Sequence, residues 1–135
     1  MLIDGDIRKG NVDKIYVLED GSNDCLGLMK VDTNFEDTNS IEFIEARPDC
    51  RAKKNPRQKR YIGETMLNFL AQLAKLTEKS SLSVPYPDRD AVGFYKKCYF
   101  ISNGKGRACM LTEDNMEKLK KNNFEHTGAV IDFIE

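Results

Sequence analysis

The spacing of apolar residues changes near residue 60, and this change constrains the fold more than any other feature of the sequence. Before it, three β-rich segments alternate with turn residues, at 13–19 (DKIYVLE), 25–33 (CLGLMKVDT) and 41–46 (IEFIEA). After it, apolar residues recur at helical spacing between residues 63 and 79, namely Met66, Phe69, Leu70, Leu73, Ala74 and Leu76. Leu67 and Ala71 widen the apolar face of this helix, so we expect it to pack against a sheet.

Shorter elements follow the helix. Residues 80–84 indicate a strand, residues 85–87 (PYP) a rigid break, and Asp88 the N-cap of a short helix that runs to Cys98. We expect further strands near 99–102 and 108–111, a turn at 103–106, a charged helix at about 113–122 and one more strand at 129–134. The chain, residues 1–135, therefore predicts one domain of mixed α/β or α+β class on one sheet, whose first three strands form an antiparallel meander.

The composition is that of an ordinary single domain. The chain has 135 residues, 32% of them charged, and a mean hydropathy of −0.55. No apolar stretch approaches the roughly 18 residues that a membrane span needs. The first ten residues contain Asp4 and lack the apolar core of a secretory signal. We therefore expect a cytoplasmic protein without a membrane partner.

Cysteine and histidine usage narrows the chemistry. The four cysteines, Cys25, Cys50, Cys98 and Cys109, form no CxxC pair, and His126 is the only histidine. This set lacks the spacing of a zinc site, so we expect no metal and favour reduced, mostly buried thiols over disulfides. A single histidine also argues against Ser–His and Cys–His hydrolases. Acid–base chemistry therefore falls to Glu, Asp, Tyr or water.

Positive charge is concentrated in one short segment. Residues 1–50 contain twelve acids and five bases, whereas residues 51–60 (RAKKNPRQKR) contain six bases and no acid. A helix that begins near Gly63 presents unpaired N–H groups just after this segment, so the junction predicts an anion site. It has neither GxxxxGKS/T nor GxGxxG, which argues against a nucleoside triphosphatase or a nicotinamide enzyme. A solvated basic loop is the alternative interpretation.

Two segments resemble the motifs of a known family. Residues 58–63 (QKRYIG) are similar to the Q/R-x-x-G-x-G/A motif that precedes a helix in the GCN5-related N-acetyltransferases, with Tyr61 at the first glycine. Residues 91–100 (AVGFYKKCYF) resemble the family's A-x-x-FY-x-K-x-GF helix, with Tyr99 at the glycine, and Asp88 stands where an asparagine is common. The resemblance covers about residues 13–111 and is in particular to small bacterial members with a lengthened loop before the glycine motif.

The resemblance implies a fold and a cofactor. The fold is a central mixed, largely antiparallel sheet with splayed strands, flanked by helices. Its N-terminus is shortened here, because only about 12 residues precede the first predicted strand. The cofactor is acetyl-coenzyme A, with its pantetheine arm between the strands at 41–46 and 82–84 and its pyrophosphate on the amides of residues 59–64. The cofactor-binding residues implied in this way are Ile44, Glu45, Ala46, Gln58, Lys59, Arg60, Tyr61, Ile62, Gly63, Glu64, Asp88, Phe94 and Tyr95.

The resemblance also implies catalytic roles. Direct transfer of an acetyl group to an amine needs a base for the amine and an acid for the departing thiolate. Tyr95 matches the family's thiolate-protonating tyrosine, and Glu42 or Glu45, acting directly or through water, lies on the strand that often supplies the base. Each residue also has a structural explanation. Tyr95 fits the apolar face of its helix, and the two glutamates fit solvent-facing positions of a strand.

The sequence thus predicts an acetyl-coenzyme A-dependent N-acetyltransferase whose acceptor is a primary amine of a small molecule or peptide. A catalytically inactive acyl-coenzyme A-binding or protein-interaction module of the same fold is the alternative. Nucleic-acid binding through residues 51–60 ranks below both, because only Tyr61 accompanies the bases as a stacking ring and the chain is acidic overall. The shortened N-terminus leaves the acceptor site either open or completed by another subunit, so a homodimer is a further expectation.

Overall fold

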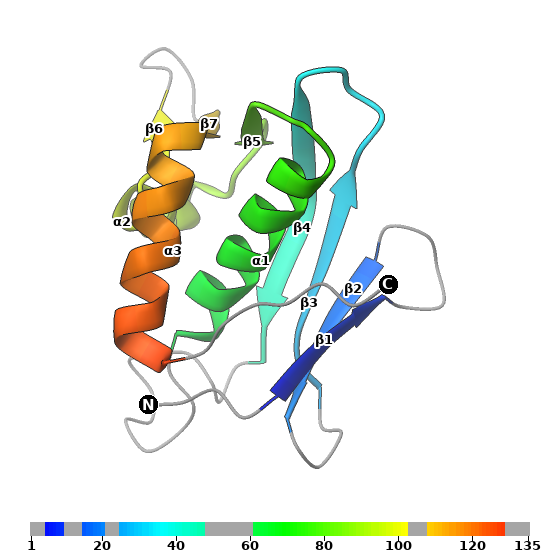
Figure 1. Ribbon diagram of the computed structural model, residues 1–135, viewed down its shortest axis with the longest axis vertical. Coiled ribbons are helices and arrows are strands. Elements are labelled where there is room, and N and C mark those ends of the chain that lie inside the picture. The colour runs from blue at the N-terminus through cyan, green and yellow to red at the C-terminus, as the bar shows by residue number, and fades with distance from the viewer. Residues whose placement is uncertain (1–4, 10–14, 21–24, 48–60, 103–107, 129–135) are drawn as a thin grey trace.

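The described residues of the computed structural model, 5–9, 15–20, 25–47, 61–102 and 108–128, form one sheet flanked by helices (Figure 1). The sheet has seven strands in the order β1-β2-β3-β4-β5-β7-β6. In chain order the elements are β1 (Gly5–Lys9), β2 (Ile15–Asp20), β3 (Cys25–Asp32), β4 (Thr38–Ala46), α1 (Ile62–Leu76), β5 (Ser81–Val84), a 3-10 turn (Arg89–Ala91), α2 (Val92–Lys97), β6 (Ile101–Ser102), β7 (Cys109–Thr112) and α3 (Glu113–Thr127). The predicted mixed class and largely antiparallel sheet are confirmed.

The antiparallel meander begins one strand earlier than the sequence predicts. β1, which the sequence does not predict, pairs antiparallel with β2 from Gly5 opposite Asp20 to Lys9 opposite Tyr16. Its sequence, GDIRK, is short and mostly polar, so it gives no alternating apolar pattern. Backbone pairing at the edge of the sheet, which needs no such pattern, explains why the strand forms.

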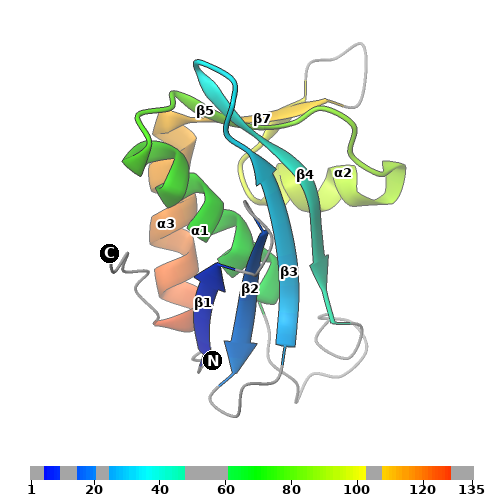
Figure 2. The same cartoon turned by 90° about the vertical axis from the view of Figure 1, so that its right-hand side faces the viewer.

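β4 and β5 are the one parallel pair among the described strands, and they separate after a short ladder. They pair only from Thr38 opposite Ser81 to Ser40 opposite Ser83. β5 then ends at Val84, because the prolines at 85 and 87 have no N–H for a ladder. β4 continues to Ala46, with β3 as its ladder partner among the described strands. This separation, visible in Figure 2, confirms the splayed strands.

α1 forms the centre of the core. It packs against β3, β4 and β5 and lies beside α3, so both its flanks are covered (Figures 1 and 2). Gly27 of β3 allows the close approach, because a Cβ at that position would lie 2.6 Å from the Met66 sulfur. The predicted packing of this helix on a sheet is confirmed. The helix ends earlier than predicted, at Leu76, because Glu78 takes a left-handed φ of 62°.

α3 is longer than the predicted segment of 113–122. It continues to Thr127 and ends at Gly128, whose φ of 68° gives a left-handed cap. The sequence understates this helix because part of its buried face is polar. Asn123, for example, is fully buried and donates a hydrogen bond to Thr65 of α1 over 3.0 Å. Polar pairing with α1 therefore replaces the apolar stripe that periodicity detects.

Two further expectations are corrected or lie outside the described residues. Asp88 is followed by the 3-10 turn and makes no side-chain capping hydrogen bond, so it is not the predicted N-cap of an α-helix. The turn at 103–106, the strand at 129–134, Cys50 and the basic segment at 51–60 lie outside the described residues. Cys98 and Cys109 are buried thiols as expected, whereas the Cys25 thiol is exposed. No helix in the described part of the chain is long and apolar enough to cross a membrane.

Candidate functional site

The first turn of α1 has the geometry of an anion site. Tyr61 is the N-cap, and its carbonyl accepts the first helical hydrogen bond from the Thr65 N–H over 2.8 Å. Its side chain makes no capping hydrogen bond, so it satisfies none of the first N–H groups of the helix. Those groups and the helix dipole favour an anion at this end. The predicted cofactor residues Gln58, Lys59 and Arg60 lie outside the described residues.

The two tyrosines that stand at motif glycines both have the backbone conformation that favours glycine. Tyr61 has a φ of 64° and Tyr99 a φ of 72°. This left-handed conformation costs an L-residue about 1–2 kcal/mol. The Tyr99 N–H donates to the Lys96 carbonyl over 3.1 Å and the Phe100 N–H to the Tyr95 carbonyl over 3.0 Å, which closes α2 by a Schellman motif. Both tyrosines thus have a left-handed conformation that glycine adopts without strain.

A cluster that the sequence analysis did not predict lies at the same end of α1. The Tyr61 ring stacks on the His126 imidazole of α3, with ring centroids 4.1 Å apart and planes 11° apart. His126 Nδ1 also lies 2.9 and 3.1 Å from the two carboxylate oxygens of Glu64, whose side chain is only 8% exposed. The Glu64 side chain therefore faces α3. Of the groups of Glu64, only the backbone N–H then remains for the predicted contact with the cofactor.

The two predicted motifs meet at Gly63. A Cβ on Gly63 would lie 2.8 Å from Phe94 Cζ, so the absence of a side chain lets the α2 ring lie on the first turn of α1. The next residue, Tyr95, is 5% exposed and packs edge-on against Phe100, with ring centroids 5.3 Å apart. The predicted acid is thereby placed one residue from the contact between the motifs.

The Tyr95 phenol is protonated at neutral pH. Burial raises the pKa of its phenol from 10.0 to about 12, with smaller contributions from the acidic groups of Cys109, Asp88 and Cys98. The phenol is therefore protonated at neutral pH and can donate a proton or a hydrogen bond. Asp88 itself is exposed.

β4 has a bulge at Glu42, and this bulge determines which face of the sheet each glutamate of β4 lies on. Lys30 of β3 is opposite Phe43 and Val31 is opposite Ile41, so Glu42 is the extra residue. Its carboxylate pairs with Lys30 Nζ at 3.0 Å, and both side chains are exposed.

Beyond the bulge, the side chains of β4 alternate between the two faces of the sheet. Ile44 and Ala46 pack against the core, whereas Glu45 is exposed on the opposite face. The structure thus places both candidate bases in solvent, while Tyr95 lies in the core.

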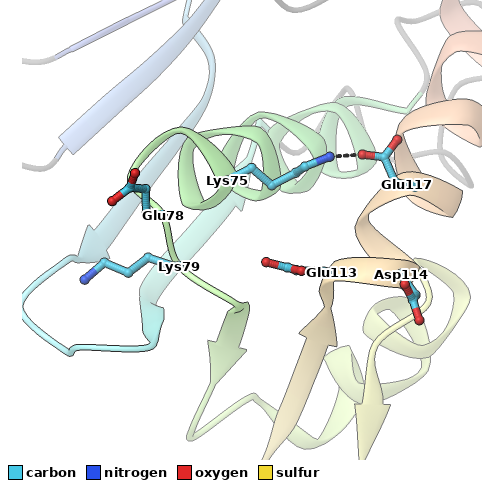
Figure 3. A pocket seen from close by; sticks show the side chains of 6 residues that line it. All are labelled: Lys75, Glu78, Lys79, Glu113, Asp114 and Glu117. Carbon is cyan, nitrogen blue, oxygen red and sulfur yellow. Dashed lines mark ion pairs between the residues drawn. The ribbon is translucent and has the colours of Figure 1, made fainter.

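A separate hollow of about 560 Å³ lies at the opposite end of α1 (Figure 3). Its charged lining has structural partners: Lys75 pairs with Glu117, and Lys79 Nζ donates to the Thr33 carbonyl over 3.2 Å. The lining residues are Lys75, Glu78, Lys79, Glu113, Asp114 and Glu117. None of them is a predicted site residue. Glu113 and Asp114 lie in the first turn of α3, where carboxylates stabilise the positive end of a helix.

The fold matches solved structures of acetyltransferases, whereas neither a protein-family model nor a curated protein sequence matches the chain. A protein of Exiguobacterium sp. 255-15 assigned as an acetyltransferase matches with a TM-score of 0.59 at 18% identity, over 80% of this chain and 69% of that chain. The spermidine N-acetyltransferase SpeG of Vibrio cholerae, in a variant form, matches with a TM-score of 0.58 at 14% identity, over 78% of this chain and 69% of that one. A variant of the toxin AtaT, bound to acetyl-coenzyme A and the C-terminus of its antitoxin AtaR, matches with a TM-score of 0.55 at 16% identity, over 79% and 71% of the two chains. At these identities the likeness establishes the fold, which is that of the GCN5-related N-acetyltransferases.

Proposed function

We propose that this protein is an acetyl-coenzyme A-dependent N-acetyltransferase that acts on a primary amine of a small molecule or peptide. The observation that supports this most is the meeting of the two motifs at Gly63 and Phe94, in a sheet whose parallel strands separate after Ser40 and Ser83. This arrangement combines a helix start suited to an anion, a β4 edge that has no ladder partner among the described residues, and a protonated phenol. In acetyl-coenzyme A, the helix start would contact the pyrophosphate, the strand edge the amides of the pantetheine arm, and the phenol the sulfur.

In this proposal the chain binds the cofactor mainly through its backbone. Beyond Ser40, β4 has β3 as its ladder partner in the described part of the chain, so the other edge of residues 44–46 is available to the amide groups of a pantetheine arm. Ile44 and Ala46 are half-buried at this edge. The N–H groups of Ile62, Gly63 and Glu64 would hold the pyrophosphate, assisted by Gln58, Lys59 and Arg60. Asp88, Phe94 and Tyr95 complete the predicted contact set.

The proposed reaction needs two proton transfers by the chain. Coenzyme A supplies the acetyl group as a thioester and leaves as a thiol. A carboxylate of β4, acting directly or through water, accepts the proton of the acceptor amine, and Tyr95 Oη gives a proton to the departing sulfur. Of the two candidates we prefer Glu45 as the base, because Lys30 already pairs with the Glu42 carboxylate.

The test is a thermal-shift titration with acetyl-coenzyme A, followed by an amine panel in which released thiol is measured. A ligand that prefers the native state stabilises it by about 2.7 kcal/mol at a hundredfold excess over Kd, so we expect a clear rise in Tm. SpeG is by name a spermidine N-acetyltransferase, so the panel includes spermidine together with lysine and peptide amines. Absence of any shift with acetyl-coenzyme A contradicts the proposal.

A second function of the same fold is supported by the setting of Tyr95. The ring packs against Phe94 and Phe100 and is almost fully buried, as a purely structural tyrosine would be. A catalytically inactive acyl-coenzyme A-binding or protein-interaction module would keep this packing. Such a module would show the thermal shift with acetyl-coenzyme A and release no thiol with any amine. The prediction that no specific nucleic acid binds is checked in the same screen with an oligonucleotide.

A further inference from the structure

We infer that α3 is part of the cofactor site, with His126 as a positioning residue for the first turn of α1. The inference rests on the proposed function, because it concerns the anionic part of coenzyme A. His126 contacts both the N-cap residue Tyr61 and the first-turn residue Glu64. Its role is to hold the backbone of that turn in the conformation that receives the pyrophosphate.

The first step is the need for a support at Tyr61. A left-handed N-cap is natural for glycine and strained for tyrosine, so the native conformation depends on contacts of the ring. The stack on His126, 4.1 Å between centroids and nearly parallel, is such a contact. The tyrosine in place of a glycine therefore makes the geometry of the helix start dependent on α3.

The second step concerns the charge of Glu64. A carboxylate in the first turn of α1 would repel an anion bound at the same helix end, unless it is turned away and paired. His126 Nδ1 is within hydrogen-bond distance of both its oxygens. The pair keeps the Glu64 side chain buried against α3 and leaves the N–H groups of the turn to the ligand.

The third step concerns the hydrogen bonds that fix the position of α3, and with it the His126 imidazole, relative to α1. Asn123, one turn before His126, donates to Thr65 Oγ1 over 3.0 Å and accepts from Asn68 Nδ2 over 3.1 Å. These side chains are buried, so breaking either hydrogen bond would leave an unpaired polar group in the core. The network fixes the register of α3 on α1 and hence the place of His126 over Tyr61.

The test measures Kd for coenzyme A and for S-acetylpantetheine, which lacks the pyrophosphate, in wild type and in His126→Ala. We expect the variant to bind coenzyme A about fivefold more weakly and to bind S-acetylpantetheine as the wild type does. The control is Phe124→Ala on the same helix, whose ring is about half-exposed, and which should leave both affinities unchanged.

A second variant separates positioning from general loss of structure. In a Tyr61→Gly, Glu64→Gln background neither the left-handed N-cap nor the charge of residue 64 needs His126, so adding His126→Ala should weaken coenzyme A binding by less than twofold. An equal loss for both ligands, or the same loss in the double-variant background, overturns the inference and leaves the proposed function intact. Failure of the wild type to bind coenzyme A overturns the proposed function itself, and the inference with it.

Discussion

Phe94 of α2 lies directly on Gly63 of α1, at a distance that no side chain on residue 63 could share. The contact joins the two segments whose sequences resemble acetyltransferase motifs, although Gly63 and Phe94 are 31 residues apart in the chain. It therefore ties the position of Tyr95, the next residue of α2, to the helix start that is proposed to bind the pyrophosphate.

The first prediction tests this contact with a matched pair of glycines. Gly63→Ala places a Cβ 2.8 Å from Phe94 Cζ, whereas Gly93→Ala on α2 meets nothing within 4 Å. Alanine in the open helical position should raise the free energy of unfolding by about 0.5–1 kcal/mol. Gly63→Ala should be less stable than Gly93→Ala by about 1–3 kcal/mol, because the Phe94 ring must move. Urea unfolding of both variants measures the difference, and equal stabilities would contradict the prediction.

The second prediction concerns the hydroxyl of Tyr95. Tyr95→Phe keeps the ring and its packing against Phe100, so Tm and coenzyme A affinity should change little. If the phenol protonates the departing thiolate, kcat should fall by about 10²–10⁴-fold. Thiol release in the presence of a productive amine measures the rate. A variant that loses stability and keeps its turnover would make the hydroxyl a structural group.

The third prediction is an alkaline loss of stability. Burial, and to a smaller extent the Glu64 carboxylate, raises the pKa of the Cys98 thiol from 9.0 to about 12, and the pKa of Tyr95 rises from 10.0 to about 12. Both groups bind their protons more tightly in the folded state, so their contribution is complete below pH 9 and is lost as pH rises toward 12. Urea unfolding at a series of pH values should show this decline.

Cys98→Ala is the control for that decline. Without the Cys98 thiol the decline should be smaller but still present, because burial also raises the pKa of the Cys109 thiol and Tyr95 still titrates. A free energy of unfolding that is constant between pH 9 and 11 in the wild type would contradict the assignment of these protons to the core.

The fourth prediction compares residues at Tyr99, where the left-handed φ follows α2. Tyr99→Gly and Tyr99→Ala both remove the ring, but only glycine also removes the backbone strain. The glycine variant should therefore be more stable than the alanine variant by about 1 kcal/mol. Glu78, which follows α1 with a φ of 62° and has an exposed side chain, offers an independent check, since Glu78→Gly should be more stable than Glu78→Ala. Equal Tm values at both positions would argue against strain.

Much of the fold could be predicted from the sequence, because most elements bury an apolar pattern of the right period. α1 is the clearest case, with leucines and Met66 at helical spacing against the sheet. β1 was not predicted, because an edge strand forms through backbone pairing. The end of α3 was not predicted, because Asn123 and Thr127 bury polar groups. Patterns of hydrophobicity contain no information about either.

The candidate site was less predictable, because its geometry depends on contacts between distant segments. The motifs indicated α1 and α2, but a lone histidine in a polar helix gives no sign that it meets Glu64, 62 residues earlier. The bulge at Glu42 likewise follows from pairing with β3 and has no signature in IEFIEA. The sequence alone could therefore name two candidate bases but could not separate them.

The last prediction separates those two glutamates. The Glu42 carboxylate lies 3.0 Å from Lys30 Nζ, so the lysine ammonium already occupies a position that an acceptor amine would need on this carboxylate. Glu45 lies beyond the bulge on β4 and is exposed, and it is the preferred base. Glu45→Gln should lower kcat by about 10²–10⁴-fold, and Glu42→Gln by less than about twofold. Lys30→Gln serves as the control, since it removes the ion pair while keeping both carboxylates. Thiol release at saturating acetyl-coenzyme A measures all three variants. If both glutamine variants keep wild-type kcat, the amine loses its proton to water or to another residue, and neither glutamate is the base.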